Sequence, residues 1–262
     1  MAKLINFSRA AWLTYKPSGK YDVRKRSKHL WSVSDASEER KVRIEIMARG
    51  SGRRNFQIMQ LLSDAEDRRP ANVGCCPLLA RLFQVYFASR ALRVSETFQE
   101  EPERYTLFDI SDAVPFGQLH TIDWRKLHNT LRRRLERILG KNVVAYGMGE
   151  VEADESRGMW QPHYHLVIHN ASNSGLSALR RKHYKAKRTG PRPMLRSRPQ
   201  SIEKWLTYIS KQTVFGKSET DGPSRRVRLN ENLSREYFRY LSVTAPTKFV
   251  FSMRCRIVKS KK

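Results

Sequence analysis

Two histidines separated by one residue are the most specific chemical feature of this sequence. His163 and His165 lie within residues 162–168 (PHYHLVI), a β-prone run that predicts a strand. Because alternate residues of a strand face the same side, both imidazoles are expected to project together and to bind one divalent metal ion. Two nitrogen donors leave room for a hard oxygen ligand. The preceding predicted strand offers Glu150 and Glu152 on a common face, and either carboxylate can complete the site.

The same histidine pair also has a purely structural interpretation. Histidines in strands serve as hydrogen-bonded core or surface residues, and two of them can occur at this spacing by chance. The nearby carboxylates and the strongly basic chain favour the metal interpretation. His169 shares the strand face of His163 and His165 but stands near its end, so we expect it to be peripheral rather than a ligand.

A tyrosine and a lysine three residues apart form a second candidate pair. Residues 201–212 (SIEKWLTYISKQ) predict a helix with Ser201 as its cap, and Tyr208 and Lys211 occupy neighbouring parts of one face of that helix. A phenol with its ordinary pKa of about 10 is a poor nucleophile, but a nearby cation can stabilise the charge that develops on it. Lys211 is such a cation. The alternative is an exposed tyrosine beside a solvated lysine.

The elements around these residues predict an α+β fold. Residues 105–110 and 142–151 are β-prone, and residues 123–139 form a strongly amphipathic helical pattern between Asp123 as N-cap and Gly140 as C-terminal stop. The order of strand, helix, two strands, helix and further strand predicts a central, mainly antiparallel sheet with flanking helices.

The sequence also predicts helices, strands and loops in segments that have no proposed catalytic or metal-binding role. Residues 152–160 are expected to be a long polar loop between the two strands of a hairpin, and residues 233–241 and 248–257 a helix and a strand. Upstream, the runs at residues 8–15 and 78–92 predict helices or buried apolar segments. The alternation at residues 42–47 predicts a short strand, and the glycines at residues 49–54 predict a loop.

The net charge points to a polyanionic partner. The 262 residues contain 51 Lys and Arg against 25 Asp and Glu, for a formal charge of +26. These cations are spread over the whole chain, which favours nucleic acid over an anionic membrane surface or a ribosome-like structural role. Residues 171–200 contain no acid, and their second half is expected to be an exposed loop. We expect this segment to bind phosphates through Arg180, Arg181, Lys182, Lys185, Lys187 and Arg188, and Tyr184 to stack on a base.

Composition excludes several classes of protein. A hydrophobic fraction of 39% supports a folded core, and no apolar run approaches the roughly 20 residues that span a bilayer. Residues 1–11 lack the apolar stretch of a secretory signal. Three cysteines cannot form a disulfide framework, so a reducing intracellular compartment such as the cytoplasm is expected.

Three blocks in order resemble motifs of the HUH endonuclease superfamily, and most closely its single-tyrosine rolling-circle replication initiators from plasmids and phages. Residues 105–108 (YTLF) are similar to the first motif, with Phe108 as a mild departure from its usual pattern. Residues 160–168 (WQPHYHLVI) resemble the metal motif, and residues 208–211 (YISK) resemble the nucleophile motif. The resemblance covers about residues 104–215 and implies the ferredoxin-like or RRM-like nuclease fold.

The resemblance also implies a mechanism. Mg²⁺ or Mn²⁺ is held by His163, His165 and Glu150 and polarises a phosphate of single-stranded DNA. Tyr208 attacks the phosphorus, which releases a 3′-OH primer and leaves the 5′-phosphate on the tyrosine. Lys211 orients a metal-bound water or offsets phosphate charge. The implied role is initiation of replication at an origin, with a host helicase and polymerase as partners. The resemblance also implies the cytoplasm of a bacterial host as the location.

Some alternatives stay open at this level. The same chemistry serves transposases and relaxases of mobile elements, and a non-catalytic basic nucleic-acid-binding protein would leave the histidines structural. Tyr237 and Tyr240 have a spacing reminiscent of two-tyrosine members of the superfamily, but their apolar neighbours favour packing. Residues 104–262 are assigned to the nuclease domain, and residues 1–103 to a basic region of unknown role.

Overall fold

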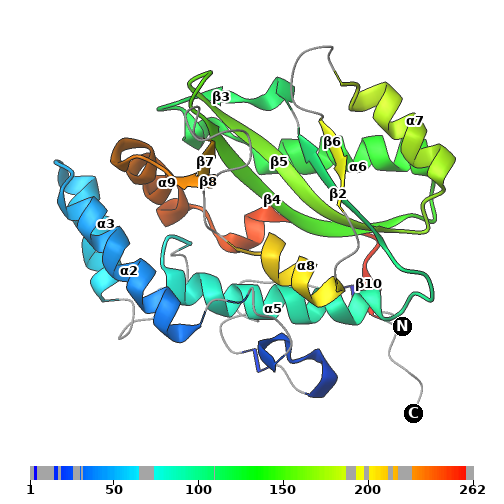
Figure 1. Ribbon diagram of the computed structural model, residues 1–262, viewed down its shortest axis with the longest axis horizontal. Coiled ribbons are helices and arrows are strands. Elements are labelled where there is room, and N and C mark those ends of the chain that lie inside the picture. The colour runs from blue at the N-terminus through cyan, green and yellow to red at the C-terminus, as the bar shows by residue number, and fades with distance from the viewer. Residues whose placement is uncertain are drawn as a thin grey trace.

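The protein has an α+β fold, as the sequence predicts, with a central sheet and helices on both of its faces (Figure 1). The computed structural model describes residues 3–4, 15–16, 19–25, 30, 32–64, 74–108, 110–186, 193–197, 201–211, 215–217 and 226–257. The α-helices among these residues are α2 (Val33–Ala48), α3 (Arg53–Ser63), α5 (Pro77–Ser95), α6 (Trp124–Leu139), α7 (Asn173–His183), α8 (Ile202–Ile209) and α9 (Glu231–Val243). Short 3₁₀ turns are η1 (Gly19–Tyr21), η2 (Val23–Lys25), η3 (Ile110–Asp112), η4 (Leu119–Thr121) and η5 (Pro246–Phe249).

The main sheet has eight strands and is antiparallel except at one pair. Its strands are β2 (Glu103–Phe108), β3 (Val114–Pro115), β4 (Val144–Asp154), β5 (Met159–His169), β6 (Met194–Arg196), β7 (Phe215–Lys217), β8 (Arg226–Arg228) and β9 (Val250–Met253). The order is β6-β2-β5-β4-β7-β8, with β3 added to β5 and β9 to β4, and only β4 and β7 run parallel. A separate two-stranded sheet pairs β1 (Lys3–Leu4) with β10 (Arg256–Ile257).

Strands β4 and β5 form the hairpin at the centre of the sheet. They pair without interruption from Val144 opposite His169 to Asp154 opposite Met159. The connection is therefore confined to residues 155–158 and is much shorter than the predicted loop. The turn is tight because Gly158 adopts a φ of 63° and because the Asp154 carboxylate accepts hydrogen bonds within the turn.

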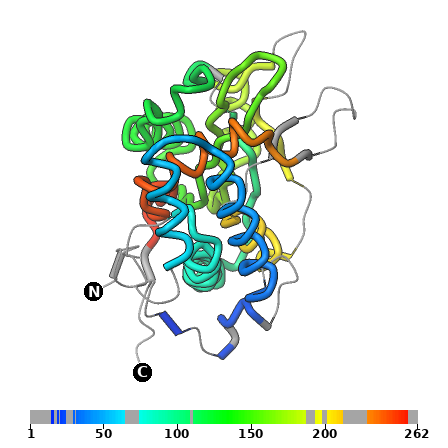
Figure 2. The backbone as a smooth tube through the Cα atoms, turned by 90° about the vertical axis from the view of Figure 1, so that its left-hand side faces the viewer, coloured from blue at the N-terminus to red at the C-terminus, as the bar shows by residue number. Residues whose placement is uncertain are grey.

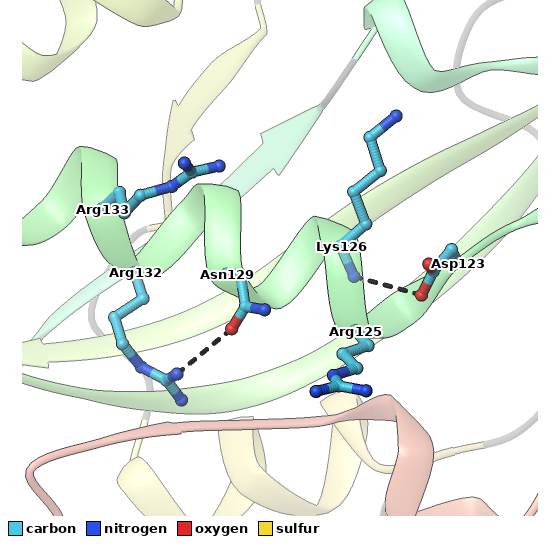
Figure 3. A pocket seen from close by; sticks show the side chains of 6 residues that line it. All are labelled: Asp123, Arg125, Lys126, Asn129, Arg132 and Arg133. Carbon is cyan, nitrogen blue, oxygen red and sulfur yellow. Dashed lines mark hydrogen bonds between the residues drawn. The ribbon is translucent and has the colours of Figure 1, made fainter.

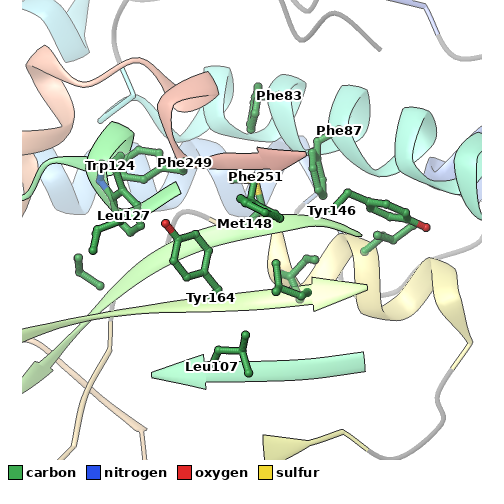
Figure 4. Packing of buried hydrophobic residues seen from close by; sticks show 14 of the residues in the cluster. Phe83, Phe87, Leu107, Trp124, Leu127, Tyr146, Met148, Tyr164, Phe249 and Phe251 are labelled. Carbon is green, nitrogen blue, oxygen red and sulfur yellow. The ribbon is translucent and has the colours of Figure 1, made fainter. Parts of the chain in front are cut away.

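Helix α6 covers one face of this hairpin, as its amphipathic pattern predicts. The Asp123 side chain accepts a hydrogen bond from the Lys126 amide, and Gly140 ends the helix with a φ of 86°. Trp124 packs edge-on against Tyr164 of β5 (Figure 4). Gly149 of β4 makes this approach possible, because a Cβ atom there would lie 2.2 Å from the Trp124 ring.

The helices upstream of residue 103 share one hydrophobic core with the sheet. Helix α5 lies along α8, where the buried Gln84 amide donates a hydrogen bond to the Thr207 carbonyl. Helices α2 and α3 lie together against α9 at one end of the molecule (Figure 2). There the Arg43 guanidinium lies 4.8 Å from the centre of the Phe238 ring.

Three predicted segments differ from the structure or lie outside it. Residues 42–47 belong to helix α2 and not to a strand, because the capping box of Ser32 and Asp35 starts a helix whose buried positions follow helical spacing. The strand predicted at residues 248–257 is divided into η5, β9 and β10, since Arg254 adopts a φ of 57° after β9. The helix predicted at residues 8–15 lies outside the described residues except for Tyr15.

The helices predicted in two other segments are confirmed. Residues 78–92 lie in α5 and residues 233–241 lie in α9. No helix in the described part of the chain has both the length and the apolar character needed to cross a membrane.

Candidate metal centre

The pairing of β4 with β5 brings one carboxylate and two imidazoles together. Glu150 stands directly opposite His163 in the register, and His165 follows two residues later on the same face. Glu150 Oε2 lies 3.2 Å from His165 Nε2 and 3.4 Å from His163 Nε2, and the two Nε2 atoms are 3.2 Å apart. The three side chains therefore direct their donor atoms at a common point.

These separations fit three ligands of a single ion. Nitrogen and oxygen ligands at about 2.1 Å from a metal lie roughly 3.0–3.4 Å from one another in octahedral or tetrahedral geometry. The three donor atoms lie within 4.8 Å of one another, and this is the one His, Cys, Asp and Glu cluster with metal-binding geometry among the described residues. Two imidazoles and one carboxylate are a donor set that borderline divalent ions accept.

The site is enclosed on the histidine side and open at the carboxylate. His163 and His165 are buried, whereas 23% of the Glu150 side chain is exposed. Burial alone would raise the pKa of Glu150, but hydrogen bonds and charge interactions with both imidazoles outweigh it and hold the pKa at about 2. Glu150 is therefore an ionised acceptor at neutral pH, as a metal ligand must be.

Strand β2 orients both imidazoles from the other side of β5. Thr106 pairs with His165 and its Oγ1 lies 2.9 Å from His165 Nδ1. Phe108 pairs with His163 and stacks on its ring with the centroids 5.0 Å apart. The His163 Nδ1 atom makes a long 3.5 Å contact with the Gln161 carbonyl, which can only accept a proton. When Nδ1 carries the proton, the Nε2 lone pair of each ring is left for a metal.

The resemblance includes residues 105–108 as a motif but gives no chemical role to Thr106 or Phe108. The β-propensity of this segment showed only that it was a strand. The missing information was the register, which sets Thr106 beside one histidine and Phe108 beside the other. An alternation pattern could have indicated that these two side chains share a face, but not which strand they would meet.

Helix α8 carries the candidate nucleophile to the same site. Its N-terminus is capped by the Ser201 side chain, and Trp205 and Tyr208 both project toward His165. The Tyr208 ring centroid lies 6.0 Å from that of His165, and the Trp205 ring centroid lies 5.7 Å from it. The two aromatic rings of α8 are also stacked on each other at 6.0 Å. Tyr208 is thereby held beside the histidine pair by an adjacent buried ring.

Lys211 lies beyond the end of α8 rather than on it, which corrects the prediction. The helix ends at Ile209, and Ser210 is its C-cap, with a hydroxyl that donates to the carbonyls of Leu206 and Thr207. The chain then turns back, and Lys211 Nζ lies 5.9 Å from the centre of the Tyr208 ring. The tyrosine and the lysine are still neighbours, but a C-terminal turn and not a shared helical face brings them together.

The other candidate carboxylate, Glu152, and the other candidate histidine, His169, lie apart from the cluster. Glu152 pairs with Gln161 and is not among the three residues whose donor atoms converge. His169 stacks on Phe98 at 3.9 Å, and its Nε2 atom lies 3.2 Å from the Tyr146 hydroxyl. The sequence did not distinguish between Glu150 and Glu152 as the acidic ligand. In the structure, Glu150 is the carboxylate that lies beside the histidines.

The competing tyrosines are packed in the core. Tyr237 stacks on Trp160, and its pKa is raised strongly, first by burial and then by the charge of Glu150. The Tyr240 hydroxyl accepts a 2.5 Å hydrogen bond from the Trp124 indole, and burial raises its pKa to about 12. Both phenols are held neutral, which opposes a nucleophilic role.

The basic residues after β5 lie on a different part of the molecule. Arg180, Arg181, Lys182 and Lys185 are exposed at and beyond the C-terminal end of α7, while Lys187 and Arg188 lie outside the described residues. Helix α7 packs against α6. Tyr184 is buried with its ring 5.6 Å from the Arg134 guanidinium, so the prediction that it stacks on a base is wrong for this conformation.

No family model, curated protein or solved structure matches this chain. The geometry of the site is therefore the basis for a proposal of function.

Proposed function

We propose that this protein is a metal-dependent nuclease of the HUH type that nicks and rejoins single-stranded DNA through Tyr208 and thereby initiates rolling-circle replication. The observation that supports the proposal is the convergence of Glu150, His163 and His165 beside the Tyr208 ring. A partly buried set of metal ligands next to a tyrosine and a lysine is a combination that supports this chemistry.

Glu150, His163 and His165 would hold Mg²⁺ or Mn²⁺. When bound, the ion acts as a Lewis acid that polarises the phosphate and offsets the negative charge of the transition state. The mixed nitrogen and oxygen donor set suits Mn²⁺ better than Mg²⁺, which prefers oxygen ligands.

The chain's own residues carry the covalent step. The Tyr208 oxygen forms a bond to phosphorus while the bond from phosphorus to the 3′ oxygen breaks. The phenol proton passes to solvent, and the departing 3′ oxygen takes up a proton to become the 3′-OH primer. Lys211, whose ammonium lies near the Tyr208 ring, favours the phenolate and the negative phosphate. Trp205 holds the Tyr208 ring in place by stacking.

Rejoining is the reverse of the same step. A 3′-OH attacks the phosphotyrosine, the bond from phosphorus to the Tyr208 oxygen breaks, and the phenol recovers a proton. Because the phosphodiester bond energy is kept in the phosphotyrosine, no nucleotide cofactor is needed. The excess of 26 positive charges supplies salt-dependent affinity for the DNA strand.

A covalent-adduct assay tests the proposal. The protein is incubated with Mn²⁺ and a labelled pool of single-stranded oligonucleotides that have a randomised central segment, and adducts are separated on a denaturing gel. Wild type is expected to form a metal-dependent adduct, and Tyr208→Phe is expected to form none while binding the pool within about threefold of wild type. Tyr21→Phe is the matched control, since Tyr21 lies in η1 with its ring 4.6 Å from Arg93.

Two results would count against the proposal. Adducts that persist in Tyr208→Phe would mean that another residue is the nucleophile. A wild-type protein that binds the pool but never forms an adduct with Mn²⁺ would favour the non-catalytic nucleic-acid-binding alternative. Sequencing of the cut sites identifies the sequence that the protein recognises.

A further inference from the structure

The outer side of helix α6 carries a straight row of cations. Lys126, Arg133 and Arg137 are all exposed, and their spacings of seven and four residues place them on one stripe of the helix. The stripe is about 16 Å long at a rise of about 1.5 Å per residue. The 16 residues of α6 include six Arg or Lys and a single acid, Glu136, which is paired with Arg254 at 2.9 Å.

These cations are not neutralised by the part of the protein that the structure describes. Lys126, Arg133 and Arg137 form no ion pair with a described residue, and the Arg133 guanidinium donates a 3.4 Å hydrogen bond to the Thr130 hydroxyl. Exposed, unpaired guanidinium and ammonium groups in a row keep their full field toward solvent.

Helix α7 adds further positive charge beside the row of cations on α6. It packs against α6 and ends in three exposed cations, Arg180, Arg181 and Lys182. Where the helices meet, a cavity of about 210 Å³ is lined by Thr130, Arg133, Arg134, Arg137 and His183. A second hollow of about 620 Å³ lies further along α6 and is lined mostly by side chains with positive charge (Figure 3). Its lining residues are Asp123, Arg125, Lys126, Asn129, Arg132 and Arg133.

We propose that this α6–α7 basic surface, formed by Lys126, Arg133, Arg137, Arg180, Arg181 and Lys182, binds the phosphate backbone of duplex DNA. Duplex DNA carries about one negative charge per 1.7 Å of axis, so a stripe about 16 Å long faces several phosphates at once. The choice of DNA rests on the proposed function, whereas the choice of a duplex rests on the surface itself.

The surface suits a duplex better than a single strand. Binding of single strands uses aromatic side chains on which unpaired bases stack. The aromatic residues of this region, Trp124 in α6 and Tyr184 after α7, are both buried, so the surface presents charge and hydrogen-bond donors. Such a surface contacts the phosphate backbone of DNA and does not recognise the bases.

The surface does not suit a membrane. A helix that lies on a bilayer inserts an apolar face between the lipids. The apolar face of α6 is formed by Trp124, Leu127, Leu131 and Leu135, and all four are buried against the rest of the protein. Only the charged side of α6 is available to a partner.

The α6–α7 basic surface and the metal centre lie on opposite faces of the sheet. Tyr164, between the two metal-site histidines, points to α6, where its hydroxyl lies 2.8 Å from His128 Nδ1. The His128 Nε2 atom donates to the Lys248 carbonyl, so α6 is anchored to the sheet on this side. His163 and His165 project from the opposite face of β5, where the His165 ring lies 5.7 Å from that of Trp205 in α8. A duplex held on one face would leave the other face free for the strand that is cut.

This inference is tested by measuring DNA binding of variants in which the sign of two charges is reversed. EDTA is present throughout, so that no metal-dependent cleavage occurs. The variant Arg133→Glu/Arg137→Glu is compared with the control Lys41→Glu/Arg53→Glu, whose exposed sites on α2 and α3 give the same change in net charge. Each protein is titrated against a mixed-sequence 30-base-pair duplex and against one strand of it, at several salt concentrations. Thermal melting checks that both variants fold.

The α6 variant is expected to lose at least tenfold in duplex affinity at 0.1 M salt, and its slope of log affinity against log salt is expected to fall by about 2, at roughly 0.9 per lost phosphate contact. Its single-strand affinity and the duplex affinity of the control are expected to stay within about threefold of wild type. Duplex binding within threefold of the control overturns the inference, and so does an equal loss for both nucleic acids. Because neither metal nor Tyr208 takes part, this result is independent of the adduct assay.

Discussion

The Thr106 hydroxyl and the Nδ1 atom of His165 are 2.9 Å apart across the β2–β5 strand pair, in a buried environment. This contact joins residues 105–108 to residues 160–168, two of the three blocks that carry the resemblance. It gives one imidazole a defined orientation, and it leaves the opposite ring nitrogen directed at Glu150. Groups that orient metal-binding histidines in this way tune the affinity of the ion.

Replacing Thr106 with valine is expected to weaken Mn²⁺ binding by about 10- to 100-fold. Valine keeps the shape and the β-propensity of threonine but removes the hydroxyl, so His165 loses the partner of its Nδ1 atom. Calorimetric titration with Mn²⁺ measures the effect, and Thr130→Val on α6 serves as the control. An unchanged affinity in Thr106→Val would show that Phe108 and Trp205 suffice to orient the ring.

Removing the charge of Glu150 is expected to abolish most metal-dependent stabilisation of the fold. In Glu150→Gln the amide oxygen is a weak ligand, so saturating Mn²⁺ should no longer raise the melting temperature, and EDTA should no longer lower it. Glu152→Gln is the matched control, two residues away on the same strand and outside the cluster. If Glu152→Gln loses the response and Glu150→Gln keeps it, the ligand assignment is wrong.

Adding a methyl group at Gly149 is expected to destabilise the protein by about 1–3 kcal/mol through overpacking. The new Cβ would lie 2.2 Å from the buried Trp124 ring, so α6 or strand β4 must shift. Urea unfolding of Gly149→Ala followed by fluorescence measures the change. The double variant Gly149→Ala/Trp124→Leu should show strong coupling between the two sites, and additive effects would contradict the steric explanation.

Burial of His169 is expected to make the protein less stable as the pH falls. Burial lowers the pKa of His169 to about 4, against about 6.5 in the unfolded chain. Between these values the unfolded state binds more protons, so this contribution is complete above pH 6.5 and is lost as the pH falls toward 4.

The size of this effect can be measured between pH 6.5 and 5. The carboxylates that line the hollow beside His169 belong to Glu100, Glu101 and Glu103. The free energy of unfolding should fall by about 1.5 kcal/mol more in wild type than in His169→Gln. His120→Gln, at an exposed site, should behave like wild type. Equal pH slopes for all three proteins would show that His169 is not held neutral by the fold.

Much of the fold followed from local patterns. The helical spacing of Trp124 and the leucines of α6, with Asp123 and Gly140 at its ends, predicted that helix because capping and amphipathicity are properties of neighbouring residues. Residues 42–47 show the limit of such reasoning. Six alternating residues fit a strand, but the burial of Arg43, Ile46 and Met47 in the core follows helical spacing.

For the candidate site, the sequence alone determined that His163 and His165 share a face, because alternation is intrinsic to an extended backbone. It also supplied the tyrosine, the lysine and the positive charge. Only the tertiary structure decided that Glu150 and not Glu152 meets the histidines, that Thr106 orients His165, and that Tyr208 lies beside the cluster. These relationships depend on strand register and on the packing of α8 against α5, which join residues far apart in the chain.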